Sequence, residues 1–139
     1  MGEKIEVDIK VPNQTRYLGL IGRIGEDIAR TMKRYTGNRD ELAYHLNMVL
    51  TEAMANTIRH ANEDDPDKVV HISISILNKN LSIRVYDQGQ GFDICSLGEP
   101  DFACLEEHGR GVFIIRSLMD KVSYRKTRDG HVLEMVKKL

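Results

Sequence analysis

The chain has 139 residues, which is the length of one domain and enough for a single continuous core. Its 20 basic and 21 acidic residues give a formal charge of -1, and no long block of like charge favours nonspecific binding of nucleic acid or membranes. The N-terminus lacks the apolar core of a signal peptide, and no later stretch approaches the ~18 apolar residues of a membrane-spanning helix. We therefore expect one cytoplasmic domain over residues 1–139, with a protein or a small molecule as its partner.

The N-terminal half predicts one strand followed by two helices. Residues 4 to 11 alternate charged and apolar side chains, which is the pattern of a half-buried strand. Apolar residues then recur every three or four positions from 14 to 35 and predict an amphipathic helix. Asn38 followed by Glu41 resembles a capping box, which would open a second helix that continues to about Ala61.

Three glycines weaken the prediction of the first helix. Gly19, Gly22 and Gly25 lie within it, and each interior helical glycine costs about 0.5 to 1 kcal/mol relative to alanine. Their three-residue spacing would place them on one side of the helix, where another backbone could approach closely. The alternative is that the helix begins only near Ile24.

The C-terminal half predicts two hairpins and one more helix. Residues 70 to 77 and 81 to 87 alternate apolar and polar side chains around a short turn, which is the clearest strand signal in the chain. A helix over residues 111 to 120 follows later, and strands over 121 to 127 and 131 to 139 close the domain. Because most consecutive strands have no helix between them, we expect a two-layer α/β sandwich, with a mixed, largely antiparallel sheet and all helices on one face.

The stretch from residue 88 to 107 is irregular and contains glycine and proline. We interpret it as a loop or lid and expect residues 92 to 107 to be among the least protected from hydrogen exchange in the absence of a ligand. Cys95 and Cys104 lie in this stretch without the spacing of a metal site. We expect both to be reduced thiols.

Residues suited to phosphate chemistry occur on the second predicted helix and in two glycine loops. Glu52 and Asn56 are four residues apart, so both side chains leave the same helical face. The sequence DQGQGF follows the end of a predicted strand, and HGRGVF opens a predicted helix. Glycine lets backbone N–H groups approach a phosphate, and a helix N-terminus adds unpaired donors. Taken alone, each pattern is also typical of a solvated helix face, an Asx turn or an ordinary helix entry.

Taken in order, the three patterns E-x-x-x-N, D-x-G-x-G and G-x-G resemble the N box and the two glycine boxes of the GHKL ATPase superfamily. They are most similar to its anti-sigma factor serine/threonine kinase branch, and the likeness spans roughly residues 15 to 139. The resemblance implies the Bergerat ATP-binding fold, with ATP and Mg²⁺ as cofactors. It also implies that the protein phosphorylates an anti-sigma-factor antagonist, sequesters a sigma factor and forms a homodimer. The alternative is a catalytically weak, nucleotide-gated switch that binds its partners without transferring phosphate.

The resemblance implies a role for each residue of the boxes. Glu52 would be the general base, Asn56 would hold Mg²⁺ through its amide oxygen, and Asp87 would accept a hydrogen bond from the adenine amino group. The glycines of the two loops would surround the nucleotide, namely Gly89, Gly91, Gly109 and Gly111. Arg110 lies between the last two glycines and either reaches a phosphate or is a surface charge.

Four further positions are less certain matches to the family. His60 resembles a family histidine, but a packing role is favoured over proton transfer, and Arg59 is expected to face solvent. Glu107 occupies a place where related kinases tend to have an arginine. A carboxylate there would repel phosphate, which argues against efficient phosphotransfer unless Arg110 takes the place of that arginine. His131 follows Gly130 where a serine or threonine is common, so nucleotide affinity is expected to differ from the family's.

Overall fold

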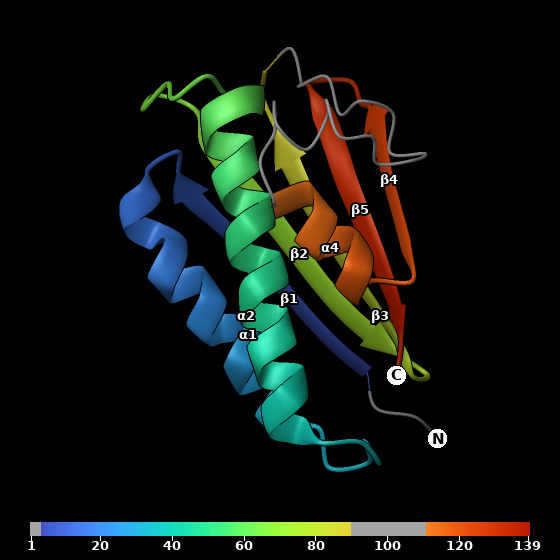
Figure 1. Cartoon of the computed structure of the whole chain (residues 1–139). Helices are drawn as coiled ribbons and strands as arrows, with labels where there is room; N and C mark the ends of the chain where they lie inside the picture. The colour runs from blue at the N-terminus through green and yellow to red at the C-terminus, as the bar shows by residue number, and fades with distance from the viewer. Residues whose placement is uncertain (1–3, 90–110) are drawn as a thin grey trace.

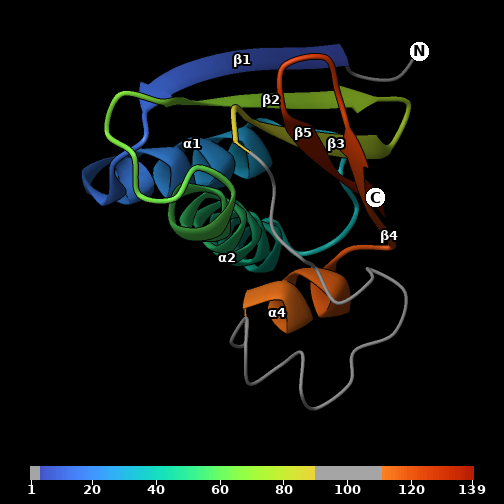
Figure 2. The same cartoon turned by 90° about the horizontal axis from the view of Figure 1, so that it is seen from above.

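A computed structural model describes residues 4–89 and 111–139 of the chain, with side chains from residue 113 onward in the second part. These residues form two layers, a five-stranded sheet and a layer of helices that covers one of its faces (Figures 1 and 2). In chain order, the elements are β1 (Lys4–Pro12), α1 (Leu18–Thr31), α2 (Arg39–Asn56), β2 (Val69–Leu77), β3 (Asn80–Asp87), α4 (Gly111–Leu118), β4 (Lys121–Lys126) and β5 (His131–Lys138).

The strand order in the sheet is β1-β2-β3-β5-β4, and every neighbouring pair of described strands is antiparallel. Ile72 of β2 lies opposite Val85 of β3, which lies opposite Leu133 of β5. All three side chains are buried, so one face of the sheet carries the core. The two-layer sandwich with helices on one face is confirmed, and the described strands contain no parallel pair.

The core lies between this face of the sheet and helices α1, α2 and α4. Because strand side chains alternate between faces, each strand contributes every second residue to it. From β2 these residues are Val70, Ile72, Ile74 and Ile76, and from β3 they are Leu81, Ile83 and Val85.

Helix α1 begins at Leu18, directly after a 3₁₀ turn at Thr15–Tyr17, so the alternative start near Ile24 is wrong. It ends at Thr31, earlier than predicted. Two of its glycines lie close to α2, but the nearest atoms belong to side chains rather than to the expected backbone. A Cβ on Gly25 would lie 2.5 Å from Leu50 Cδ1, and one on Gly22 would lie 2.7 Å from Asn47 Nδ2. A Cβ on Gly19 would have no described atom within 4 Å apart from its own stretch of helical backbone. The expected close approach is therefore wrong for Gly19.

Helix α2 begins as the capping pattern predicts, because the Asn38 side chain accepts a hydrogen bond of 3.1 Å from the backbone N–H of Glu41. Its regular α-helical part ends at Asn56. The chain then widens into a π-helical turn at Thr57–Ala61, where Asn62 N–H donates to the Thr57 carbonyl oxygen over 2.8 Å. The sequence predicted a single regular helix through this region.

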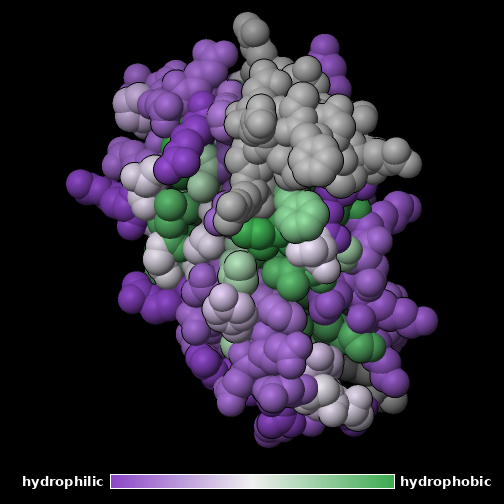
Figure 3. All heavy atoms as spheres, in the orientation of Figure 1, coloured by the Kyte–Doolittle hydropathy of each residue, from purple (hydrophilic) through white to green (hydrophobic). Residues whose placement is uncertain are grey.

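The surface seen in Figure 3 is mainly hydrophilic at its edges, with apolar side chains gathered near the middle of the helical layer. A few large apolar residues are exposed, namely Leu20, Tyr44, Leu77 and Phe113. Within residues 4–89 and 111–139, no helix combines the length and the apolar character needed to cross a membrane.

Candidate functional site

Glu52 and Asn56 lie on the last turns of α2, on one face of that helix. Glu52 is half-buried, whereas Asn56 is only 8% exposed. The Asn56 Nδ2 atom is buried and has no hydrogen-bond partner among the residues that the structure describes. A buried polar group without a partner costs about 1 to 3 kcal/mol. The described residues therefore leave the Asn56 Nδ2 atom without a partner, and such an atom in a native structure calls for an explanation, of which a ligand is one.

Asp87 ends β3 with its side chain on the helix-covered face, and it is 4% exposed. Its Oδ1 atom accepts hydrogen bonds from the backbone N–H groups of Gly89, at 3.1 Å, and His131, at 3.2 Å. Its Oδ2 atom accepts a hydrogen bond of 2.7 Å from the Tyr124 hydroxyl. Strands β4 and β5 and the turn after β3 thus all contribute to holding this carboxylate.

Two glycines allow the backbone to pack closely around Asp87. A Cβ on Gly89 would lie 1.6 Å from the carbonyl oxygen of Ala61, at the end of the π-helical turn. One on Gly130 would lie 2.1 Å from the carbonyl oxygen of Asp87 itself. Neither neighbour is a flexible side chain, so both positions require glycine. The described contacts of Gly89 give it a packing role against the π-helical turn that follows α2, and its predicted contact with nucleotide stays a prediction.

A buried pair of asparagines joins three segments next to this turn. Asn62 Nδ2 donates to Asn13 Oδ1 over 3.0 Å, and the Asn62 Oδ1 atom accepts from the Gln88 backbone N–H over 2.9 Å. Asn13 Nδ2 in turn donates to the Asp65 carbonyl oxygen over 3.0 Å. The pair fixes the glycine turn against the end of α2 and the end of β1.

Sequence reasoning missed both asparagines, as well as Tyr124 and the position of His131. The last of these was noted only as a departure from the family pattern. Asn13 follows Pro12 at a strand end, and Asn62 begins a polar loop, so both resembled ordinary turn residues. Only the three-dimensional structure reveals that they are 2% and 0% exposed.

The predicted site residues that the structure describes lie on one side of the sheet. Glu52, Asn56 and Gly111 belong to helices α2 and α4, which cover one face of the sheet (Figure 1). Asp87 at the end of β3 is buried like the other residues of β3 that face these helices. Arg59 is exposed and His60 is half-buried, as expected of a solvent-facing residue and a packing residue.

Several predictions fall on positions outside the described residues. Gly91, Gly109, Arg110 and Glu107 lie there, as do the proposed lid and the two cysteines, Cys95 and Cys104. The roles given to these positions therefore stay predictions. Gly111 begins α4 where the glycine pattern placed a helix start.

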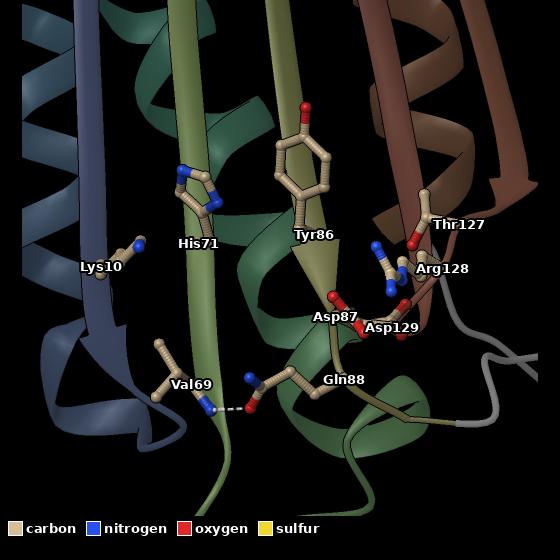
Figure 4. Close-up of a pocket in the computed structure, with 9 residues that line it drawn as sticks. All are labelled: Lys10, Val69, His71, Tyr86, Asp87, Gln88, Thr127, Arg128 and Asp129. Carbon is tan, nitrogen blue, oxygen red and sulfur yellow. Dashed lines mark hydrogen bonds between the residues drawn. The ribbon is translucent and has the colours of Figure 1, made fainter.

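A cavity of about 500 Å³ opens on the other face of the sheet. Its lining combines side chains from β1, β2 and β3 with the β4–β5 turn (Figure 4). His71 hydrogen-bonds to Asp8 at 2.5 Å and stacks on Tyr86, and the Gln88 side chain accepts a hydrogen bond from the Val69 N–H over 2.8 Å. This cavity lies on the face opposite Glu52 and Asn56, although Asp87 at the end of β3 is among its lining residues, and no sequence pattern predicted it.

The same open face carries an ion network across β3, β5 and β4. Glu134 lies 2.6 Å from Arg84 Nε and 3.3 Å from Arg125 Nη1. The hydrogen bond from Arg84 is the main cause that lowers the pKa of Glu134, and Arg125 adds to it. The same contact raises the pKa of Arg84.

Comparison with known proteins gives the family to which the chain is similar. A family model described as the histidine kinase-like ATPase domain matches residues 12–137. The anti-sigma F factor of Anoxybacillus flavithermus is 34% identical over 105 residues, which cover 72% of this chain and 71% of that protein. The serine-protein kinase RsbW of Bacillus subtilis is 30% identical over 141 residues, which cover 96% of this chain and 85% of that protein.

A solved structure also shares the fold. The histidine kinase domain from the Erythrobacter litoralis EL346 blue-light activated histidine kinase superposes with a TM-score of 0.58 at 20% identity, and the match covers 93% of this chain. The chain spans 62% of the length of that structure. Together with the matching family model, these likenesses confirm the resemblance seen in the three sequence boxes: the chain belongs to the family of histidine kinase-like ATPase domains.

Proposed function

We propose that this chain is an ATP-dependent protein kinase that phosphorylates a serine or threonine of an anti-sigma-factor antagonist and also sequesters a sigma factor. The relatives named anti-sigma F factor and serine-protein kinase RsbW support this class. The observation that carries the proposal is the unused Asn56 amide, which is buried one helical turn from the Glu52 carboxylate on the face where the family pattern requires both.

The residues present fit a magnesium nucleotide. An amide oxygen is a suitable ligand for a hard cation, and rotation of the Asn56 amide about its last bond exchanges its oxygen and nitrogen. The buried amide can therefore present its oxygen. Mg²⁺ held by Asn56 would supply positive charge that offsets the negative charge developing on the phosphates. At the other end of the site, the Asp87 carboxylate would accept a hydrogen bond from the adenine amino group.

Glu52 would act as the general base. As the acceptor hydroxyl oxygen forms its bond to the γ-phosphorus, the bond from that phosphorus to the departing ADP oxygen breaks, and the hydroxyl proton moves to the Glu52 carboxylate. Glu52 is half-buried, so it remains accessible to a hydroxyl that a partner protein inserts.

The decisive experiment incubates the purified protein with labelled ATP, Mg²⁺ and candidate antagonist proteins encoded beside it. We expect phosphate transfer by the wild type and a decrease of about 10²- to 10⁴-fold for Glu52→Gln, because this is the usual contribution of a positioned base. Glu52→Gln should leave nucleotide and partner binding nearly intact. Glu41→Gln is the matched control, since Glu41 lies on the first turn of the same helix with a side chain that is 65% exposed.

Nucleotide binding is tested separately by thermal unfolding and calorimetry. MgATP should raise the melting temperature of the wild type, because a ligand that binds only the native state stabilises it. Asn56→Ala should weaken the magnesium-dependent part of this effect, and Asp87→Asn should weaken binding of the adenine nucleotide itself. Absence of any shift or heat with millimolar MgATP would refute the nucleotide site.

One sequence feature favours a second candidate function. Glu107 carries a negative charge where related kinases tend to have an arginine that assists the γ-phosphate. If the wild type and Glu52→Gln both bind MgATP and the partner but transfer no phosphate, the kinase assignment fails. The chain would then be a nucleotide-gated binding switch. Homodimer formation is a further prediction, and sedimentation of the purified protein tests it.

A further inference from the structure

The Asp87 carboxylate has an unusual set of partners for a buried charge. Its side chain is 2% exposed, yet its three described hydrogen-bond donors are two backbone N–H groups and the Tyr124 phenol rather than an arginine or a lysine. Buried charges are expensive unless they are paired and hydrogen-bonded. The arrangement around Asp87 is therefore built to hold a carboxylate at one orientation.

The described donors can be counted against the acceptor sites. An ionised carboxylate offers about four lone-pair sites, two on each oxygen. Gly89 N–H and His131 N–H occupy both sites of Oδ1, and the Tyr124 hydroxyl occupies one site of Oδ2. A single site on Oδ2 then remains for an external donor. One hydrogen of an exocyclic amino group would fill it.

Tyr124 is itself held in place by His131. The two rings stack with centroids 5.0 Å apart and an interplanar angle of 7°. They lie on neighbouring strands as a diagonal pair, because Tyr124 is opposite Leu133 and His131 is opposite Lys126. The His131 Nδ1 atom is buried, has no hydrogen bond within the described part of the chain and lies 3.6 Å from Asp87 Oδ1. His131 thus contacts both the phenol and the carboxylate.

From this geometry we infer that Tyr124 and His131 are positioning residues for base recognition, which orient Asp87 so that Oδ2 offers one acceptor site to the 6-amino group of an adenine nucleotide. The inference rests on the proposed nucleotide function and extends it to two residues outside the three sequence boxes. Tyr124 donates the fixing hydrogen bond, and the His131 ring limits the movement of the phenol. Without the Tyr124 hydroxyl, the Asp87 carboxylate would either keep an unfilled acceptor site when the nucleotide is bound or turn towards water.

The test compares two nucleotides in two proteins by calorimetry. ADP carries the 6-amino group, and purine riboside 5′-diphosphate has hydrogen in its place. For Tyr124→Phe we expect ADP affinity to fall roughly tenfold, because a hydrogen bond to a charged group contributes on this scale. Affinity for the deamino nucleotide should change by less than about twofold, since it does not donate to Asp87. The ratio of the affinity for ADP to the affinity for the deamino nucleotide should therefore fall by nearly the same tenfold factor. A general structural defect would weaken both nucleotides equally.

Tyr86→Phe is the matched control. It removes the hydroxyl of the residue next to Asp87 on the same strand, but its side chain lies on the open face of the sheet (Figure 4). The preference for ADP should be unchanged. His131→Ala is a second variant, and it keeps the Tyr124 hydroxyl. We expect it to lower the preference for ADP over the deamino nucleotide, but by less than Tyr124→Phe does.

An unchanged ratio of the two affinities in Tyr124→Phe would overturn the inference while leaving the nucleotide site intact. Should Tyr124→Phe fail to fold, an unchanged ratio in His131→Ala would overturn it equally. If the wild type binds neither nucleotide, the proposed function and the inference both fail.

Discussion

Two polar networks link the same three strands, β3, β5 and β4, on opposite faces of the sheet. The outer one joins Arg84, Glu134 and Arg125, and its central carboxylate is paired with two guanidinium groups near solvent. The inner one joins Asp87, His131 and Tyr124, and the described donors within hydrogen-bond distance of its buried carboxylate are all uncharged. The carboxylate of the outer network has two arginine partners, whereas the described partners of the inner carboxylate leave one of its acceptor sites unfilled. This difference is why we propose the nucleotide site on the face that carries Asp87.

The largest expected effect comes from distorting the turn that carries the inner network. Gly89→Ala would place a Cβ 1.6 Å from the Ala61 carbonyl oxygen, and two backbone segments would have to separate. We expect a loss of about 3 kcal/mol or more in the free energy of unfolding, at or above the upper end of overpacking effects. Denaturant unfolding monitored by circular dichroism measures this loss.

Gly19→Ala is the control for that substitution. Gly19 lies in α1, and a methyl group added there would have no described atom within 4 Å, so alanine should be neutral or stabilise the protein by up to about 0.5 to 1 kcal/mol. Equal destabilisation by the two variants would mean that the close contact with Ala61 is not what requires glycine at position 89.

An intermediate effect is expected from the asparagine pair that supports the turn. Asn62→Ala leaves the Gln88 N–H and the Asn13 amide oxygen without their partner. Unsatisfied buried groups cost about 1 to 3 kcal/mol, so we expect a loss of about 2 kcal/mol in the free energy of unfolding. In a double-mutant cycle, Asn13→Ala added to Asn62→Ala should cost less than the sum of the two single effects. Strict additivity would show that the two side chains do not stabilise each other.

The smallest effect is expected on the open face. Glu134→Gln should cost about 0.2 to 1 kcal/mol near neutral pH, because Arg84 is 46% exposed and solvent screens the pair. The folded-state pKa of Glu134 is lowered, so the unfolded chain binds its proton first as the pH falls. The stabilisation is therefore present above the ordinary glutamate pKa of about 4.3 and disappears as the pH falls through the folded-state value.

Unfolding free energies of the wild type and Glu134→Gln across this acidic range measure the pH dependence. Their difference should shrink at low pH and also in high salt. A difference that is constant with pH would contradict the ion network as its cause. Nucleotide binding should be equal in the two proteins, since Glu134 is on the face opposite Glu52 and Asn56.

The elements that could be predicted from sequence were those with a strong periodicity. The alternation in β2 and β3 predicted both strands and the face that is buried, and Asn38 with Glu41 predicted the start of α2. The four-residue spacing of Glu52 and Asn56 predicted that both would lie on one face of a helix, as they do on α2. The partners of Asp87 could not be predicted, because Tyr124 and His131 meet it only through the pairing of β4, β5 and β3. The local sequence also gave no signal for the π-helical turn at Thr57–Ala61.

The π-helical turn at Thr57–Ala61 decides how a change of length in this segment would act. Each residue of a regular α-helix turns the chain by about 100°, and a π-helical turn accommodates an extra residue by widening. Deleting a residue from the regular part of α2 would therefore rotate Asn62 away from Asn13 and Gln88 by about that angle. Deleting the exposed Arg59 would instead remove the extra residue of the wide turn, so a regular helix would keep Asn62 in nearly the same direction. Insertions in the exposed loop at Glu63 and Asp64 should also be tolerated.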